Sequence, residues 1–442
     1  MIIGQAFPRI AEFAGVSRAG GSCYCHPSNL TVKRLVWDED RDPKGRGLNE
    51  VIATGALQKR TTLALETATT LEQIAALGPC YARLNRVTGN TLPFALHEWH
   101  LAWCRHFLNC DPRIRDRPLF CVLHNSAGEC VALFPFIVSR RRVGPLDIVS
   151  VNLLGADPAI TEIRAPLIEP GYERLAALAV QDRLAKLGGW DWVHWTGLSD
   201  ALAEPLALGR RLQWQPALSD FVLDLAPTWE EFRLGLKRNI RESLRHCYNS
   251  LRRDGHHFEL QVMQDPAEMR AGLDRFLELH VLRANMQTSA IHPNRFDSQV
   301  SREFLHDVCG RLAERGIVRL FTLKIGSQAV AMRIGFVVGE NLYLYYSGFD
   351  PEWSQYSVMT TTVAEAIKYA IAHSLKSVDL SPTKDFSKTR WGPRQVDYEA
   401  AIEQGAGLRS RLASRAYIKA RSDPEGQSWL LKHLIPARRT WR

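Results

Sequence analysis

The chain has 442 residues, of which 45% are hydrophobic and 23% are charged, so it is long enough to form two hydrophobic cores. The formal net charge is +9, but residues 405–442 hold nine Lys or Arg against Asp423 and Glu425. The rest of the chain is only mildly basic, which argues against a dedicated nucleic-acid-binding protein. The longest apolar run, residues 130–138, is too short to span a bilayer, and the first residues lack the pattern of a secretion signal, so we expect a cytoplasmic protein without stable membrane insertion.

Residues 1–60 are rich in Gly, Ser, Pro and charge, which predicts a flexible leader. The pattern becomes regular after that, with one helix predicted over residues 70–84 and another over residues 96–107. In the second helix Trp99, Trp103 and Phe107 recur every four residues on one face. That spacing is more typical of core packing than of a ligand site.

Two β-hairpins, about 200 residues apart, resemble each other. Residues 119–139 and residues 318–338 each predict a hairpin with a Gly shortly before a Val-Ala pair at the start of the second strand. Each is followed by further strands, then a helix, at 172–187 or 357–373, and then a short strand. This shared order indicates a degenerate internal duplication, with chance similarity of two hairpins as the alternative.

Between the two halves, residues 227–255 predict a single helix. Thr228 and Glu231 fit a capping box, and Gly255 fits the end. The apolar stripe of this helix consists of Phe232, Leu236, Ile240, Leu244 and Leu251. Its other face is basic, with Lys237, Arg238, Arg241, Arg245, Arg252 and Arg253. That face is either solvated or a wall for an anionic substrate, and Lys237 and Arg241, four residues apart, are the pair predicted to bind substrate.

Residues 343–370 predict an aromatic strand, an abrupt turn and a helix whose first turns are crowded with hydroxyl groups. The first N–H groups of a helix have no partner within it and carry partial positive charge, so a phosphate can bind there without Lys or Arg. The pyrophosphate of coenzyme A would fit, with its amide arm along the strand. The residues predicted to contact it are Ser347, Gly348, Gln355, Ser357, Thr360 and Thr361. The alternative is that Ser357 caps the helix and the threonines only pack.

Cysteine and histidine residues give no metal motif. The nine cysteines are scattered and odd in number, and Cys23 and Cys25 have the wrong spacing for a zinc or redox site, so buried thiols are expected. His256 and His257 enter a strand, where adjacent side chains face opposite ways and cannot easily share one ion. His280 is expected to be a hydrogen-bonded helix histidine. We therefore expect no metal.

Five segments, none diagnostic alone, occur in a specific order: "PFALHEWHLAW" (93–103), "LKRNIRESLR" (236–245), "FLELH" (276–280), "YYSGFDPEWSQYS" (345–357) and "SVDLSPTKDFSKTRWG" (377–392). From about residue 63 to 402 the chain resembles the CelD/BcsL-like acetyltransferase family of the GNAT superfamily, which is related to FemAB aminoacyltransferases. The resemblance implies an α/β (α+β) fold of tandem GNAT-like domains, each a mixed, mostly antiparallel sheet flanked by helices. It also implies acetyl-CoA or another acyl-CoA as donor and an amine or sugar-linked acceptor, often in envelope or exopolysaccharide biosynthesis.

The expected domains are a leader (1–60), an N-terminal acceptor-side domain (61–226), a C-terminal acyl-CoA-side domain (227–404) and a basic helical tail (405–442). The tail has a sparse apolar face, so a plain basic tail is favoured over a membrane-binding one. In the first half, the matching helix start presents Glu169 and Glu173, which would repel a phosphate, so one donor site per chain is expected.

Acyl transfer to an amine needs a base, a donor for the developing oxyanion and an acid for the leaving thiolate. Asp379, at the end of a short strand, is the candidate base or acceptor-orienting carboxylate; its alternative is a strand-end residue that bonds local backbone. Tyr345 and Tyr346 alternate along a strand, so only one can face the site, and Tyr346 is favoured.

The residues after Asp379 are candidates for substrate binding. Lys388 and Arg390 could hold an anionic group or be solvated, and Trp391 could wall the pocket or belong to the core. The family usually reads Tyr-Ser-Pro-Gly at the helix start and Tyr-Lys ahead of Arg-Trp. This chain has Tyr-Ser-Val-Met at residues 356–359 and Ser-Lys at 387–388, so a tyrosine that might act as general acid is absent.

Three functions follow from these patterns. The first is an acyl-CoA-dependent N-acyltransferase acting on a small-molecule, glycan-linked or peptide-linked acceptor. The second is a FemAB-like aminoacyl-tRNA-dependent transferase, in which the basic helix would contact tRNA. The third is a non-catalytic scaffold that kept the fold. The sequence leaves the acceptor and the oligomeric state open.

Overall fold

In the computed structural model the described residues are 63–143, 146–155, 160–208, 212–286 and 292–422. The predicted leader and residues 423–442 of the predicted tail therefore lie outside the described residues. The chain divides into two compact units, Met1–Leu57 and Gln58–Arg442, and every described residue belongs to the second. Within the described part, no helix combines the length and the apolar character that a membrane crossing requires.

The first half of the described chain runs to Asp224. Its strands are β1 (Ala64–Ala68), β2 (Ile114–His124), β3 (Cys130–Val143), β4 (Leu146–Leu153), β5 (Leu167–Ile168), β6 (Trp192–Leu198) and β7 (Leu212–Asp224). Its helices are α1 (Leu71–Ala75), α2 (Gly78–Val87), the 3-10 helix η1 (Pro93–Ala95), α3 (His97–Phe107), α4 (Glu173–Leu187) and α5 (Asp200–Ala207). The helix predicted over residues 70–84 is interrupted between α1 and α2, because Pro79 has no N–H to donate to the carbonyl four residues earlier.

The second half begins at Trp229. Its strands are β8 (Phe258–Met263), β9 (Val318–Ile325), β10 (Gln328–Val338), β11 (Asn341–Phe349), β12 (Ser377–Asp379) and β13 (Arg394–Gln404). Its helices are α6 (Trp229–Gly235), α7 (Arg238–Arg253), α8 (Pro266–Ala284), α9 (Gln299–Glu314), the 3-10 helix η2 (Pro351–Tyr356), α10 (Val358–Ala372), α11 (Phe386–Thr389) and α12 (Leu408–Ser422). Both predicted hairpins, and the helix and short strand that follow each, are confirmed.

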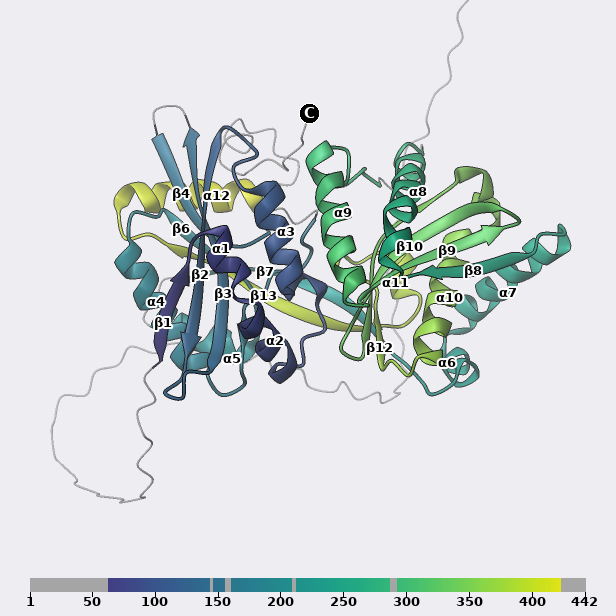
Figure 1. Ribbon diagram of the computed structural model, residues 1–442, viewed down its shortest axis with the longest axis horizontal. Coiled ribbons are helices and arrows are strands. Elements are labelled where there is room, and N and C mark those ends of the chain that lie inside the picture. Colours follow the sequence, from purple (N-terminus) through teal and green to yellow (C-terminus); the bar gives the residue numbers. More distant parts are fainter. Residues whose placement is uncertain (1–62, 144–145, 156–159, 209–211, 287–291, 423–442) are drawn as a thin grey trace, which may run out of the picture. The chain divides into compact units, whose positions relative to one another are not determined.

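The strands form one mixed, mostly antiparallel sheet in the order β1-β2-β3-β4-β6-β13-β7-β12-β11-β10-β9-β8, with β5 paired to β3. Two pairs, β4–β6 and β11–β12, are parallel. The order is symmetric about its centre, where β7 of the first half pairs with β12 and β13 of the second half pairs with β6 (Figure 1). Each half therefore completes the sheet of the other. The predicted fold class, a mixed sheet flanked by helices, is confirmed.

The backbone supports the internal duplication in detail. Each hairpin has a β-bulge near the start of its second strand, with Val131 as the extra residue in β3 and Val330 in β10. In each half an arginine of the covering helix, Arg83 of α2 or Arg275 of α8, donates to the carbonyl of the residue before the bulge, at 2.7 and 3.1 Å. Two hairpins that share strand order, bulge and helix contact are related by more than chance similarity.

The side chains of the sheet alternate between two hydrophobic clusters. Phe120 and Val122 of β2 pack in the cluster of α3, α8 and α9, whereas Leu119 and Cys121 pack in the cluster of α4 and α5. Trp99 of α3 is fully buried in the first cluster, which confirms core packing for the aromatic stripe of that helix. Figure 1 shows these helices against the strands of their clusters.

The prediction of a single helix over residues 227–255 is wrong in one respect. The Thr228 hydroxyl accepts from the Glu231 N–H as predicted, but the chain leaves the helix after Gly235 and re-enters it at Arg238. Leu236 and Lys237 have extended ψ angles of 148° and 149°. The break lets the predicted apolar stripe, from Phe232 to Leu251, stay buried throughout, so tertiary packing overrides the local helical pattern.

Candidate functional site

The segment between β11 and α10 has an unusual backbone. Asp350 caps η2 through its side chain, which accepts from the Glu352 N–H at 3.1 Å. Ser357 then adopts a left-handed conformation (φ 52°, ψ 42°) before α10 begins, and its hydroxyl makes no capping bond. The alternative in which Ser357 is a side-chain helix cap is therefore wrong, because the capping geometry needs an extended backbone at that residue.

The hydroxyl groups at the start of α10 have different partners. Thr360 Oγ1 accepts from Arg390 Nη2 at 2.6 Å, and the Thr362 hydroxyl donates to the Val358 carbonyl at 2.8 Å. Thr361 is fully buried, and its hydroxyl has no hydrogen-bond partner among the described residues. The three threonines therefore do not form one surface, and only Thr360 is tied to a predicted substrate-binding residue.

A pocket of about 200 Å³ lies at the N-terminus of α10. Its lining consists of Arg283, Met286, His292, Phe349, Ser354, Ser357, Val358 and Met359. Arg283 of α8 donates to Ser347 Oγ at 2.6 Å, and its Nε is buried with no hydrogen-bond partner in the part of the chain that the structure describes. A fixed guanidinium and a helix N-terminus thus converge on one cavity, an arrangement suited to an anion. We name this cavity the α10 pocket.

The end of β11 is covered by α8. Ser347 is buried, and a Cβ at Gly348 would lie 2.3 Å from the backbone nitrogen of His280. Only glycine permits that approach of helix to strand. His280 Nδ1 lies 2.9 Å from the Ser347 carbonyl, and its Nε2 accepts from the Arg295 N–H at 3.2 Å. Burial lowers the pKa of His280 to about 4, so it is the hydrogen-bonded neutral helix histidine that was expected.

The strict alternation expected for Tyr345 and Tyr346 is wrong. The register of β10 with β11 shifts so that both tyrosines lie opposite Ile334 alone, and their ring centroids are 4.4 Å apart. A bulge of this kind interrupts the alternation of side chains. Tyr345 is buried and donates to the Ile160 carbonyl at 2.6 Å, while Tyr346 is half-buried against Phe296 and His280.

Asp379 lies in β12, next to β11 on one side and β7 on the other. It is almost fully buried, and so is Asp220, which lies two residues along β7 from Val222, the residue paired with Asp379. Burial first, and then the charge of the partner, raises the pKa of Asp379 well above its ordinary value, and burial also raises the pKa of Asp220. Two carboxyl groups buried side by side favour sharing one proton over losing both, so this pair can both accept and donate a proton.

A third carboxyl group comes from the first half. Tyr343, opposite Asp379 in β11, donates to Glu162 Oε2 at 2.8 Å. Burial raises the pKa of Glu162 to about 7, with the Tyr343 hydrogen bond and the charge of Lys388 opposing it. Lys388 Nζ is 2.6 Å from the Pro382 carbonyl and 3.1 Å from Ser381 Oγ, and burial lowers its pKa. We name Asp220, Asp379, Glu162, Tyr343 and Lys388 the carboxylate cluster.

The other predicted site residues are dispersed. Trp391 is buried in the core cluster of α10, and Gln355 is exposed in η2. Lys237 is exposed as the N-cap of α7 and lies outside the helix that contains half-buried Arg241, so the predicted shared helix face is wrong. Within the described residues, the structure records no hydrogen bond or ion pair between these two side chains and the other predicted site residues.

Several residues of the site were missed from the sequence: Arg283, Glu162, Asp220 and Tyr343. For Arg283 a signal existed, because Phe276, His280 and Arg283 recur at helical spacing on the buried face of α8. A charged residue on a buried face needs partners. For Glu162 no local signal exists, since its partners lie more than 180 residues away.

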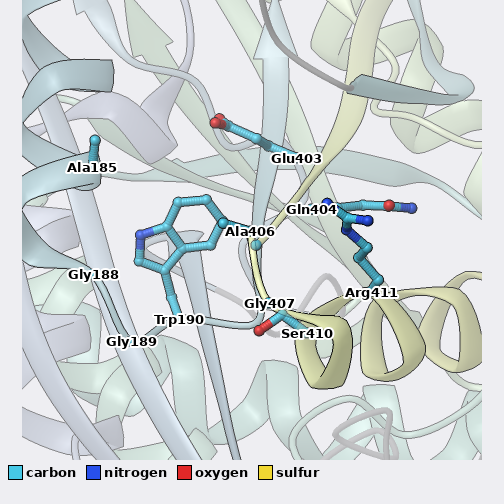
Figure 2. Close-up of a pocket in the computed structure, with 11 residues that line it drawn as sticks. Ala185, Gly188, Gly189, Trp190, Glu403, Gln404, Ala406, Gly407, Ser410 and Arg411 are labelled. Atoms are coloured by element: carbon cyan, nitrogen blue, oxygen red, sulfur yellow. The ribbon is translucent and has the colours of Figure 1, made fainter.

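A second, larger pocket of about 460 Å³ lies where β13 leads into α12 (Figure 2). Figure 2 shows Trp190, Glu403, Ser410 and Arg411 around it. Two of its polar side chains are already engaged, since Glu403 accepts from Trp195 Nε1 at 3.1 Å and Ser410 donates to Asp191 at 2.9 Å. We therefore place the candidate site at the α10 pocket and the carboxylate cluster.

Comparison with known sequences supports this placement. Residues 238–389 match the family model of an acetyltransferase (GNAT) domain. This segment runs from the first residue of α7 to the last of α11, and it includes Arg283, Ser357 and Asp379. The second half therefore carries a GNAT-type transferase domain. A comparison with curated proteins found no match.

A comparison with solved structures found partial similarity to FemX, to L-PGS and to a tandem GNAT protein. FemX shares 12% identity with a TM-score of 0.49, over 72% of this chain and 95% of its own. L-PGS from Bacillus licheniformis shares 12% identity with a TM-score of 0.45, over 77% and 94%. A tandem GNAT protein from the clavulanic acid biosynthesis pathway shares 12% identity with a TM-score of 0.40, over 78% and 100%.

Proposed function

We propose that the protein transfers an acyl group from acyl-CoA, with acetyl-CoA as the first donor to test, to an amine on a small-molecule, glycan-linked or peptide-linked acceptor. The observation that carries this proposal is the α10 pocket. There the guanidinium of Arg283 and the N-terminus of α10 meet at Ser357, inside the segment that matches the acetyltransferase domain. A pyrophosphate is the part of acyl-CoA that such a pocket would bind.

Arg390 extends the same anion site. It holds Thr360 through one Nη, and its Nε is buried without a hydrogen-bond partner among the described residues. A buried guanidinium N–H with no acceptor is costly, and a phosphate oxygen would supply one. Arg283 precedes α10 in the sequence and Arg390 follows it. Two guanidinium groups favour a doubly anionic ligand more strongly than the hydroxyl groups of α10 alone would.

The carboxylate cluster supplies the acid–base chemistry. In the proposed reaction the acceptor nitrogen forms a bond with the thioester carbonyl carbon, and the bond from that carbon to sulfur breaks. The ionised member of the Asp220–Asp379 pair takes the proton from nitrogen, and coenzyme A leaves as a thiolate that is then protonated. A pair with raised pKa values suits this role, because its proton affinity lies nearer to neutral pH than that of an ordinary aspartate.

Calorimetric titration with CoA, ATP and NAD tests the donor class. We expect one CoA site per chain and no heat from ATP or NAD at the same concentrations. Two CoA sites would contradict the assignment of the donor to the second half, and absence of CoA binding would contradict the acyl-CoA proposal itself.

One observation favours a second candidate, an aminoacyl-tRNA-dependent transferase. Arg245 and Arg252 of α7 are exposed on the basic face of that helix, where RNA could reach them. Filter binding of tRNA at several salt concentrations distinguishes this candidate. A steep loss of binding with salt would favour it, whereas no binding at low salt would exclude it.

A further inference from the structure

Three side chains of metal-ligand type meet in the first half, outside the carboxylate cluster and the α10 pocket. Cys80 of α2, His124 at the end of β2 and Cys130 at the start of β3 offer two sulfur atoms and an imidazole nitrogen that all lie within 4.8 Å of one another. Cys130 is buried, and the other two are half-buried. No metal motif was recognised in the sequence, because Cys80 is distant in the chain from His124 and Cys130 and joins them only through the packing of α2 on the β2–β3 hairpin.

The hairpin geometry brings the two hairpin members together. The bulge at Val131 leaves Cys130 directly opposite His124 in the register of β2 with β3. Arg83, three residues after Cys80 in α2, holds the carbonyl of Cys130 and thereby keeps Cys80 over the hairpin. Two contacts therefore hold the cluster together: the pairing of His124 with Cys130 in the sheet, and the hydrogen bond from Arg83 to the Cys130 carbonyl.

The second half shows that the fold does not require these residues. The equivalent bulge places Ala329 opposite Lys324, and the residue three positions before Arg275 is Gly272. Each of the three positions thus has a residue without sulfur or imidazole in the other copy, although the helix, the bulge and the arginine contact are all retained. A purely structural role for two cysteines and a histidine would not call for this difference.

We infer that Cys80, His124 and Cys130 bind one divalent, thiophilic cation, and that the chemistry of the ligands favours zinc. Ligand atoms around a tetrahedral zinc lie roughly 3.5 to 3.8 Å apart, so the three atoms need to move inward by only about 1 Å. On binding, the two thiols lose their protons to solvent and become thiolates. The imidazole binds in its neutral form.

The fourth position belongs to solvent. His124 lines an open pocket at the edge of the sheet that is also lined by Leu63, Ala64, Glu66, Asn125, Ser126 and Gly128. Water can therefore reach the side of the cation that faces this pocket. Glu66 lies two residues from the residue paired with His124, and a carboxylate there can hydrogen-bond to the bound water. The bound cation fastens α2 to the hairpin.

Metal titration of the full-length chain under reducing conditions tests the inference. After treatment with a chelator, the chain is titrated with Co²⁺ and then with Zn²⁺. We expect one Co²⁺ per chain, a sulfur-to-cobalt charge-transfer band with the d–d absorption of a tetrahedral site, and displacement by Zn²⁺. Cys130→Ala, which copies Ala329 of the second half, should weaken Zn²⁺ binding at least about a hundredfold and reduce the charge-transfer band.

Two controls make the test specific. Cys23→Ser/Cys25→Ser removes the cysteines that lie outside the described residues and should leave the stoichiometry at one. The triple variant Cys80→Ser/His124→Gln/Cys130→Ala should bind no Co²⁺ with thiolate character, and its melting temperature should no longer rise on addition of Zn²⁺. Equal binding by wild type and triple variant would overturn the inference, as would a reduced wild-type chain that binds no metal.

Discussion

The two halves of the molecule share a strand order, a hairpin bulge and a helix contact, but they differ in the segment that connects a strand to the following helix. In the second half β11 carries an extra bulge, and the chain enters α10 through left-handed Ser357 and the pocket of Arg283. In the first half β3 and β4 pair without a shift. The fold thus occurs twice, whereas among the described residues the pocket that joins a guanidinium to a helix N-terminus is found in the second half.

The first half has an ion pair shortly before its matching helix. Glu169, four residues before α4, accepts from Arg83 at 2.7 Å. The first half instead contributes Glu162 to the carboxylate cluster of the second, through Tyr343. The difference teaches that duplication allowed the second half to hold the α10 pocket while the first half supplies Glu162 to the carboxylate cluster.

The largest effect is expected from a charge placed in the α10 pocket. Ser357→Asp should weaken CoA binding about a thousandfold, because a carboxylate within about 4 Å of a phosphate costs on the order of 4 kcal/mol at an effective dielectric near 20. Aspartate tolerates the left-handed backbone, so the melting temperature should not fall. Calorimetry and thermal unfolding of the same variant measure both.

Ser357→Asn is the matched control, because it has the same shape and no charge. It should bind CoA within a fewfold of wild type. If Ser357→Asp also bound CoA normally, the difference between the halves at this helix N-terminus would have no bearing on donor binding.

The next effect concerns the carboxyl pair. Asp379→Asn should lower kcat by at least about a hundredfold, the usual contribution of a positioned base. Since the pKa of Asp379 is raised, activity of the wild type should increase with pH as the pair loses its shared proton, and the variant should lose this dependence. The pH–rate profile with unchanged CoA affinity is the measurement, and an unaltered profile would return Asp379 to a structural role.

A smaller effect is expected on acceptor use. Replacement of Lys237 and Arg241 by Ala should raise the acceptor KM about tenfold if the acceptor is anionic, and should leave CoA affinity unchanged. Lys237 is exposed and sits outside α7, so the Arg241 single variant should carry most of the change. An acceptor KM equal to that of wild type would show that this basic face is solvated and does not bind the acceptor.

The smallest effect is on stability. Burial raises the pKa of Glu162 from 4.5 to about 7, so the folded state binds its proton more tightly than the unfolded state does. This contribution is fully present below about pH 4.5 and is lost as the pH rises to about 7. Glu162→Gln should therefore flatten the decline of unfolding free energy across this window. Glu230→Gln, at an exposed carboxylate, should leave the decline unchanged, and the same decline in Glu162→Gln would contradict the assignment.

Much of the fold was predictable because its signals are local. The hairpin at residues 119–139, the helix of Trp99 and the strand–turn–helix around Ser357 all follow from alternation, helical spacing and turn residues. The prediction of one helix over residues 227–255 was wrong at Leu236, because the break depends on the core residues against which the apolar stripe packs. The symmetric strand order, with β7 and β13 exchanged, has no sequence signature.

The sequence by itself determined the elements, the duplication and the hydroxyl-rich start of α10, because each depends on residues close together in the chain. Only the tertiary structure decided which polar groups meet. It placed Asp220 beside Asp379 through the pairing of β7 with β12, brought Glu162 to Tyr343, placed Arg283 in the α10 pocket, and gathered Cys80, His124 and Cys130. Such contacts depend on the packing of strands from both halves in one sheet. The neighbours that stabilise a buried charged side chain, or shift its pKa, are supplied by this packing.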